Sequence, residues 1–433
     1  MTKENKQAES MLQTLVKTTD YLRKNNLKTV NEKMKPAFKQ IYGGISSLTE
    51  SFYGSAQLEG NKVLDNLTDA MEHGAALSAF FDEFDKWKGI LMDDLDALNE
   101  YSCNLDQDFA KIMVRIHNVS RQDMIENLKK ELNKIRSKSV DNYRKIVEFH
   151  NSFSYYWGKL DPDNNVYERF ESCVDELKEN AERYTWLYSI LADYRSKKVL
   201  YGILKFWLDL DYAVKNTLVE KSFAPYLDLD VLGEMSDKEV ILDCGAYKGN
   251  SILAYLDNFS SFQKAYAYEM VPSLCEKMKE ELKDVENVEI HNAAITSNGM
   301  SKKKIFINDN PSLSTTSLLD PENAAIYDSD ADVPNKPDSK VPIDGVPIDK
   351  DIAEPVTYIK MDIEGSEMDA IKGGKNHIKY DKPKLAIAAY HKYSDLWEIP
   401  ENLSKLNSKY KFYLRYYGAT NGYTASEYVL YAI

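Results

Sequence analysis

The pattern of apolar and polar residues changes near residue 180 of this 433-residue chain. From Gln7 to about Asn180, apolar residues recur at spacings of three and four, as in Met11, Leu15 and Val16, and prolines are few. This periodicity is typical of amphipathic helices. It predicts an all-α helical bundle of roughly five or six helices over residues 1–181, as an accessory domain.

One run of this region, Ser120 to Phe149, has apolar residues spaced through a charged background at Met124, Leu128, Leu132 and Ile135. The run fits either a coiled-coil surface for a partner or packing inside the bundle, and the second is the commoner fate. Basic residues interleaved with glutamates predict a solvated helix face rather than a binding surface. These basic residues are Lys129, Lys130, Lys134, Arg136 and Lys138.

Between Glu168 and Tyr226 the pattern is helical again, and from Asp243 onward it becomes an alternation of short apolar runs and helical segments. This alternation predicts a mostly parallel α/β sheet covered on both faces, in a domain over residues 182–433. The expected strands cover residues 240–242, 265–268, 288–290, 304–307, 357–361, 384–389, 412–414 and 428–433. Ligands of such sheets collect at the carboxyl ends of the strands.

The first of these strands, Val240 to Leu242, ends in Asp243 and a loop that contains Gly245, Ala246 and Gly249. A helical pattern resumes at Ser251, so the loop leads into a helix N-terminus, which attracts a carboxylate or a phosphate. The spacing is not the G-x-G-x-x-G of dinucleotide sites. We expect Gly245 to allow a ligand close to the backbone and Asp243 to face a ligand ammonium.

A second acidic strand end, Glu269, suits the paired hydroxyls of a ribose, because an acid is expected roughly 20 residues beyond such a loop. The ligand should therefore carry a ribose, a carboxylate and an amine, and S-adenosylmethionine has all three. Asn292, Asp362 and His391 also follow predicted strands. We expect all of them at one edge of the sheet, with Asp243, Gly245, Ala246, Gly249, Glu269, Asn292 and Asp362 binding the cofactor.

Three carboxylates, Asp362, Glu364 and Glu367, follow the strand that ends at Met361. Like charges at this density need a cation or hydrogen bonds to offset them. The cation could be the sulfonium of the cofactor or a divalent metal such as Mg²⁺, with Asp362 and Glu364 as its ligands. In the alternative interpretation, Glu364 and Glu367 only flank the following helix, where the dipole favours acids.

His391 follows the strand that ends near Tyr390. An unperturbed imidazole titrates near pH 6.5, so His391 could accept a hydroxyl proton while a methyl group arrives. In the alternative interpretation, His391 is a structural residue that only forms hydrogen bonds. We predict that His391 and Asp362 carry out the catalytic step.

Several of these motifs together resemble the FkbM family of S-adenosylmethionine-dependent methyltransferases, from about Tyr184 to the C-terminus. The motifs are Asp243–Gly249, Asn310–Ser317, Ile359–Gly365, Tyr390 and His391 with Asp395–Trp397, and Glu427–Tyr431. The resemblance implies a Rossmann-like sheet of seven strands and methylation of a hydroxyl on a sugar, glycan precursor or natural product. N-methylation of an amino group and a non-catalytic helical interaction protein that keeps the fold stay as alternatives.

The composition limits the partners. A formal net charge of −14 argues against nucleic acid as the main partner, because no basic excess is present to release counterions. No window of about 20 apolar residues and no apolar leader is found, so we expect a protein without a membrane span. The four cysteines lack metal-like or paired spacing, which favours a reducing, cytoplasmic location. The N-terminal helices could mediate self-association or bind a protein partner.

Overall fold

The computed structural model describes residues 95–307, 339–418 and 427–433, which form two compact units. The helical unit comprises Met1–Glu234 and Tyr413–Tyr428, and the sheet unit comprises Met235–Phe412 and Val429–Ile433. The helical pattern at Met11, Leu15 and Val16 and the loop Asn310–Ser317 lie outside the described residues. The predicted domain boundary at residues 181 and 182 stays a prediction.

Helices dominate the described part of the helical unit. They are α5 (Leu95–Asn118), α6 (Arg121–Lys138), α7 (Val140–Ser152), α8 (Ser154–Trp157), α9 (Glu168–Glu179), α10 (Ala181–Ile190), α11 (Tyr194–Asp209), α12 (Tyr212–Asn216) and α13 (Leu229–Leu232). A short antiparallel hairpin, β1 (Leu160–Asp161) and β2 (Val166–Tyr167), lies between α8 and α9. Across the described ranges, no helix is both long and apolar enough to cross a membrane.

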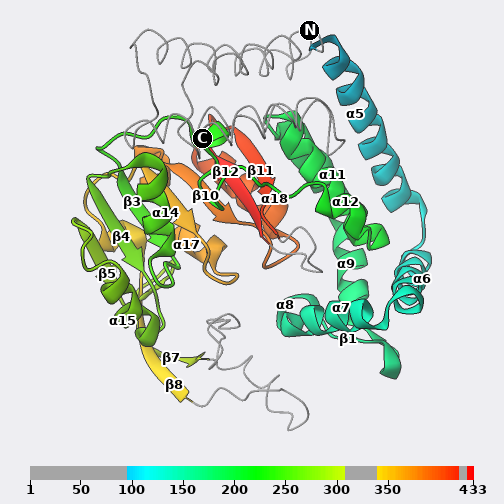
Figure 1. The fold of residues 1–433 in the computed structure, drawn as a ribbon, viewed down its shortest axis with the longest axis horizontal. Helices are drawn as coiled ribbons and strands as arrows, with labels where there is room; N and C mark the ends of the chain where they lie inside the picture. Colours follow the sequence, from blue (N-terminus) through cyan, green and yellow to red (C-terminus); the bar gives the residue numbers. More distant parts are fainter. Residues whose placement is uncertain (1–94, 308–338, 419–426) are drawn as a thin grey trace, which may run out of the picture. The chain divides into compact units, whose positions relative to one another are not determined.

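The run from Ser120 to Phe149 is two helices rather than one. Ser120 caps α6 by accepting a hydrogen bond from the Asp123 N–H, and Ser139 ends α6 and caps α7. Met124, Leu128 and Leu132 are buried, and α6 contacts α7, α9 and α11 (Figure 1). The apolar positions of this run therefore pack inside the bundle.

The basic residues of α6 lie on its solvated face, as predicted. Lys130, Lys134, Arg136 and Lys138 are exposed, and Lys129 is half-buried. Lys129 and Lys134 form ion pairs with glutamates one turn away on the same helix. Exposed pairs of this kind contribute only about 0–1 kcal/mol each.

The main sheet has seven strands in the order β11-β12-β10-β9-β3-β4-β5. Their bounds are β3 Val240–Cys244, β4 Lys264–Tyr268, β5 Val288–His291, β9 Tyr358–Met361, β10 Lys384–Ala388, β11 Phe412–Tyr416 and β12 Tyr428–Ala432. Strands β5, β4, β3, β9 and β10 run parallel, and β12 is antiparallel to β10. The prediction of a mostly parallel, seven-stranded sheet is confirmed.

Strand β3 lies between β4 and β9, so the strand order reverses beside it. Such a switch point is where open α/β sheets bind ligands, at the carboxyl ends of the strands. All five residues of β3 are buried, which explains its continuous apolar sequence before Asp243. The helices of this unit include α14 (Asn250–Phe259), α15 (Pro272–Glu281), α17 (Glu367–Gly373) and α18 (Asp395–Leu406) (Figure 1).

A second, three-stranded sheet has the order β6-β8-β7. It consists of β6 (Ala294–Ile295), β7 (Met300–Ile307) and β8 (Ser339–Val346). The strand predicted at residues 304–307 is thus the end of β7 and pairs antiparallel with β8, outside the main sheet. An apolar run alone does not specify which sheet a strand joins, because pairing is a long-range choice.

Candidate functional site

The loop after β3 turns through left-handed backbone conformations at Gly245 (φ 79°), Tyr247 (φ 51°) and Gly249 (φ 87°). The N–H groups of Gly245 and Ala246 both donate to the Tyr268 carbonyl, each at 2.9 Å. A Cβ on Gly245 would lie 1.9 Å from the Asp362 carbonyl oxygen. Glycine is therefore required here by the close approach of the chain's own backbone, whereas the sequence had suggested approach by a ligand.

Asp243 is buried (2% exposed) and its carboxylate faces protein groups. Lys360 Nζ on β9 lies 3.1 Å from Asp243 Oδ1 and donates to the Gly245 carbonyl at 2.5 Å, and the Ser251 hydroxyl donates to Asp243 Oδ2. Burial would lower the pKa of Lys360, but Asp243 and Asp362 raise it. In this geometry Lys360 occupies the place that we expected for a ligand ammonium beside Asp243.

Lys360 was missed as a site residue in the sequence. Its signal was a lysine between Ile359 and Met361, inside a strand that is otherwise apolar and fully buried. A buried lysine needs an anionic partner, because the desolvation of an unpaired ammonium is costly. The partner was Asp243 on the neighbouring strand, and only the pairing of β3 with β9 identifies it.

Glu269 follows β4 and holds the glycine loop. Its carboxylate accepts hydrogen bonds from the N–H groups of Tyr247 (3.0 Å) and Val271 (2.9 Å), and burial raises the pKa of this carboxyl. An ionised carboxylate has about four lone-pair sites, so two stay open to a ligand. The amide of Asn292 donates to the backbone carbonyls of Glu269 and Met270, both at 3.0 Å, and fixes this strand end.

Helix α14 begins directly after this loop. Its N-cap is Gly249, which provides no side-chain hydrogen bond to the first turn. The first N–H groups of an α-helix have no partner within the helix, and they carry the positive end of its dipole. The loop therefore presents an N-terminus suited to a carboxylate or a phosphate.

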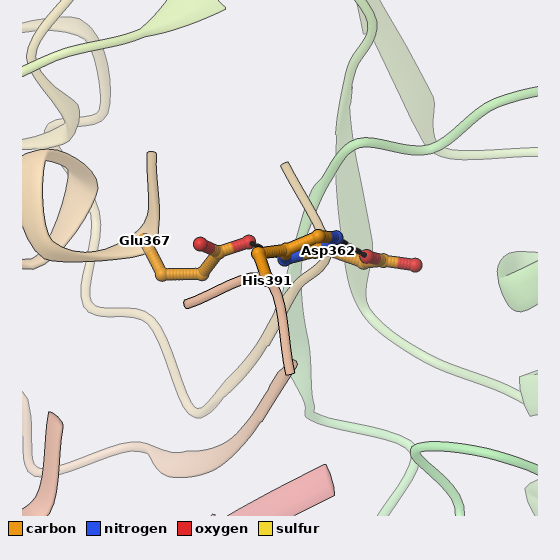
Figure 2. A group of neighbouring side chains, drawn as sticks. All are labelled: Asp362, Glu367 and His391. Carbon is orange, nitrogen blue, oxygen red and sulfur yellow. Dashed lines mark ion pairs between the residues drawn. The ribbon is translucent and has the colours of Figure 1, made fainter. Parts of the chain in front are cut away.

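His391 forms the centre of a second cluster at the same carboxyl edge of the sheet. The side chain is buried (1% exposed), and its Nδ1 lies 3.1 Å from Glu367 Oε1. Its Nε2 lies 3.4 Å from Glu364 Oε2 and 3.7 Å from Asp362 Oδ1. Figure 2 shows His391 between Glu367 on one side and Asp362 on the other.

These carboxylates control the charge of His391. Burial alone would lower the pKa of the imidazole, but Glu367 and Glu364 raise it well above its ordinary value. Burial would likewise raise the pKa of Glu367, but His391 lowers it. His391 is therefore an imidazolium at neutral pH, and it pairs most closely with Glu367 while it also faces Glu364 and Asp362.

The neighbouring Asp395 titrates differently. Burial first, and then the charge of Glu367, raise the pKa of its carboxyl to about 7. Its side chain accepts a hydrogen bond from the Lys392 N–H at 2.7 Å. A buried carboxyl next to another carboxylate is the expected case for an acid that stays partly protonated near neutral pH.

The donor atoms of Asp362, Glu367 and His391 lie within 4.8 Å of one another and could hold a metal ion. Glu364, which the sequence suggested as a Mg²⁺ ligand together with Asp362, is not part of this group. A set with one imidazole suits a transition metal better than Mg²⁺, which prefers oxygen ligands. With Glu367 and His391 forming an ion pair, the imidazolium already supplies the positive charge.

Asp362 joins the two clusters. Its N–H donates to the Cys244 carbonyl at 3.0 Å, and its Oδ1 accepts a hydrogen bond from the Tyr390 hydroxyl at 3.2 Å. All the predicted site residues lie at or just beyond the carboxyl ends of the strands β3, β4, β5, β9 and β10. They are Asp243, Gly245, Ala246, Gly249, Glu269, Asn292, Asp362, Glu364 and His391. Cys244 within this edge is a buried free thiol.

The strand order and the glycine loop at the switch point define a Rossmann-like methyltransferase fold. Residues 243–415 match the family model described as the methyltransferase FkbM domain. The resemblance expected from the motifs is confirmed over these residues, which match the FkbM methyltransferase domain.

Among solved structures, the chain is similar to the methyltransferase FkbM from Methylobacillus flagellatus KT, with 24% identity, a TM-score of 0.47 and 60% of each chain covered. A putative methyltransferase from Streptococcus mutans in complex with SAH has 14% identity and a TM-score of 0.28, covering 47% of this chain and 92% of that one. Aeropyrum pernix fibrillarin with natively bound S-adenosyl-L-methionine has 13% identity and a TM-score of 0.26, covering 46% and 70%. A comparison with curated proteins gave no match.

Proposed function

We propose that the protein is an S-adenosylmethionine-dependent methyltransferase that acts on a hydroxyl of a sugar, glycan precursor or other natural product. The observation that carries the proposal is the match of residues 243–415 to the FkbM methyltransferase family model. The position of the Asp243–Gly249 loop at the switch point beside β3 supports it, because ligands bind there in open α/β sheets. The cytoplasmic location and the partner role of the N-terminal helices stay predictions from the sequence.

The residues present fit the cofactor in two places. The first turn of α14 has N–H groups without a side-chain cap, which suits the carboxylate of the methionine part. Glu269 has lone pairs left for ribose hydroxyls. Asp243 is engaged by Lys360, so we assign it the support of the loop, where it holds Lys360 against the Gly245 carbonyl.

When bound, S-adenosylmethionine supplies an electrophilic methyl group on sulfur. With the cofactor bound, an acceptor hydroxyl would take up this methyl group, and a side chain of the protein would have to accept the hydroxyl proton. His391 is protonated at neutral pH and buried, so it is a poor base. We assign the proton to the carboxylate of Asp362, which is 28% exposed, and we assign His391 the role of positioning Asp362.

A binding experiment tests the cofactor assignment. Calorimetric titration of the full chain with S-adenosylmethionine should show saturable binding, and Glu269→Gln should weaken it about tenfold, since one charge-assisted hydrogen bond contributes about 1.5 kcal/mol. The control is Asp257→Asn, at an exposed position of α14, which should bind as tightly as wild type. Absence of binding to the wild-type protein would sink the enzyme hypothesis and favour the non-catalytic alternative.

A kinetic experiment tests the base. With an acceptor found by screening hydroxyl and amine compounds, Asp362→Asn should lower kcat about 10²–10⁴-fold with little change in KM. His391→Gln should lower kcat less and leave the acid limb of the pH profile in place. If instead kcat/KM rises with pH above 7 and this rise disappears in His391→Gln, His391 is the base and our assignment is wrong. Acceptance of amines alone would favour N-methylation.

A further inference from the structure

Asp362, the base assigned to the reaction, is held at one of its two carboxylate oxygens. The Tyr390 hydroxyl donates a hydrogen bond to Oδ1 at 3.2 Å. His391 Nε2 faces the same oxygen at 3.7 Å, which is too long for a hydrogen bond. Within the part of the chain that the structure describes, the Tyr390 hydroxyl is therefore the group that donates a hydrogen bond to this side chain.

The other oxygen, Oδ2, receives no hydrogen bond and forms no ion pair with any described residue. Figure 2 shows one carboxylate oxygen of Asp362 turned toward His391 and the other turned away from it. The side chain is 28% exposed, so the carboxylate can be reached from outside. Each oxygen of an ionised carboxylate accepts hydrogen bonds through about two lone-pair sites. Oδ2 is therefore the oxygen that is available to accept a proton.

The backbone of Asp362 is fixed as well. Its N–H donates to the Cys244 carbonyl at 3.0 Å. Its carbonyl oxygen lies so close to Gly245 that a Cβ there would approach it to 1.9 Å. An aspartate side chain has two torsions, and a fixed backbone together with a fixed Oδ1 leaves them little freedom. The direction of Oδ2 is therefore set by the backbone contacts and by Tyr390.

Tyr390 reaches Asp362 because the two residues follow adjacent parallel strands. Met361 at the end of β9 pairs with Ile387 of β10, so the carboxyl ends of these strands lie together. Tyr390 is half-buried, and its ring packs on the imidazole of His391 with the ring centres 4.2 Å apart. This contact restricts the phenol ring and thereby the position of its hydroxyl.

Charged groups from three segments lie near Asp362. His391 follows β10, Lys360 lies on β9, and Glu364 meets the same imidazole nitrogen from the loop after β9. Asp362 helps to raise the pKa of Lys360, because their opposite charges attract. Such charges act over a distance and do not specify the angle of a carboxylate, whereas a hydrogen bond is directional. Tyr390, unlike these charges, can fix the angle of the Asp362 carboxylate.

We propose that Tyr390 is a positioning residue, which holds Oδ1 of Asp362 so that Oδ2 faces the acceptor and receives its proton. The proposal rests on the proposed function, in which Asp362 is the base. The proton of the acceptor hydroxyl would move to Oδ2 while the hydroxyl oxygen takes up the methyl group. Orientation of a base contributes to the rate of the chemical step, so loss of the Tyr390 hydroxyl should lower kcat rather than affinity.

Tyr390→Phe removes the hydroxyl and keeps the ring that packs on His391. With the acceptor identified by the screen, this variant should lower kcat about tenfold or more, the loss expected for one hydrogen bond to a charged group. The KM for the acceptor and the calorimetric affinity for S-adenosylmethionine should stay unchanged. An unchanged kcat, a loss confined to KM, or a variant that fails to fold would overturn the positioning role.

Tyr410→Phe is the matched control. It removes a buried tyrosine hydroxyl that donates to the Pro383 carbonyl at 2.8 Å, at the amino end of β10. This variant should lower Tm but leave kcat unchanged, because its hydrogen bond lies at the other end of the strand from Tyr390. An equal loss of kcat in both variants would mean that the Tyr390 hydroxyl acts through general stability, which contradicts the proposal.

A double-mutant cycle tests whether Tyr390 acts through Asp362. Transfer of a labelled methyl group makes the residual activity of Asp362→Asn measurable. In this background Tyr390→Phe should change kcat by less than about twofold, because the carboxylate that it positions is absent. A further tenfold loss would show that the two residues act independently, and Tyr390 would then not be a positioning residue for Asp362.

The same measurements separate the role of Tyr390 from the proposed function. Absence of methyl transfer by the wild-type protein would overturn both. Full activity of Asp362→Asn would overturn the assignment of the base, and with it the role of Tyr390. An impaired Asp362→Asn together with an unimpaired Tyr390→Phe would overturn the role of Tyr390 alone.

Discussion

The two buried histidines, His150 of the helical unit and His391 of the sheet unit, carry opposite charge states at the same burial. Each is 1% exposed. The pKa of His391 is raised by Glu367 and Glu364, whereas burial and the cations Arg169 and Lys215 lower the pKa of His150. Burial alone therefore does not decide whether a histidine is charged, because the neighbouring charges decide it.

The two units therefore differ in how the charged side chains of their interiors are surrounded. In the sheet unit, opposite charges from β9, α17 and the end of β10 meet, so the cluster is balanced by its own side chains. In the helical unit, positive groups from α7, α9 and α12 gather among aromatic rings. In the first arrangement opposite charges lie side by side, whereas in the second the cationic groups lie against aromatic faces.

The largest expected effect is on the balanced cluster. Glu367→Gln leaves the buried imidazolium of His391 without its nearest carboxylate and should lower the free energy of unfolding of the sheet unit by about 3–5 kcal/mol at pH 7. Native-state hydrogen exchange of the amides in α17 and β10 measures this loss. Glu280→Gln, which breaks an exposed pair with Lys283, should cost less than about 1 kcal/mol. Equal losses in the two variants would mean that His391 is not held as a buried cation.

A smaller change in the free energy of unfolding, a gain rather than a loss, is expected for a variant of the helical unit. The folded pKa of Lys215, about 8, lies below its ordinary 10.5, so the charged amine destabilises the fold fully below pH 8, and the penalty vanishes above pH 10.5. Lys215→Met should therefore raise the free energy of unfolding by up to about 3 kcal/mol at pH 7.

Denaturation by urea between pH 7 and 10.5 measures this gain for Lys215→Met. The difference from wild type should shrink as the pH rises through this range. A gain that is independent of pH would reflect packing alone and would contradict the charge argument.

A second titration effect, in the sheet unit, concerns Asp395. Its folded pKa of about 7 lies above the ordinary 3.8, so its protonated form is favoured by folding and its ionisation costs stability as the pH rises from about 4 to 7. Asp395→Asn keeps an acceptor for the Lys392 N–H and should raise Tm at pH 8 by roughly 2–4 °C, with no gain at pH 4. Thermal scans at the two pH values test this, and an equal gain at both would exclude the titration of Asp395 as the cause.

The smallest expected effect is that of a chelator. Because His391 already provides a positive charge beside Asp362, Glu364 and Glu367, removal of divalent ions by EDTA should leave Tm and methyl transfer unchanged. A lowered Tm that Mg²⁺ restores would establish the metal site suggested by the sequence at Asp362 and Glu364. Restoration by a transition metal alone would favour the group of Asp362, Glu367 and His391 instead.

Much of the fold could be predicted from the sequence because its signals are local. The apolar run Val240–Leu242, its acidic end and its glycines predict a strand, a turn and a helix, and the structure contains β3, the loop and α14 there. The strand at residues 304–307 was predicted correctly, but the sequence did not indicate that it joins the three-stranded sheet. Strand pairing depends on contacts between distant residues, which periodicity does not encode.

The sequence by itself determined which groups stand at the strand ends, since Asp243, Glu269, Asn292, Asp362 and His391 each follow an apolar run. The tertiary structure decided which charges meet. It pairs Asp243 with Lys360 across β3 and β9, and it encloses His391 among carboxylates. The physical reason is that the charge of a buried group depends on neighbours within a few ångströms, and those neighbours come from other strands and helices.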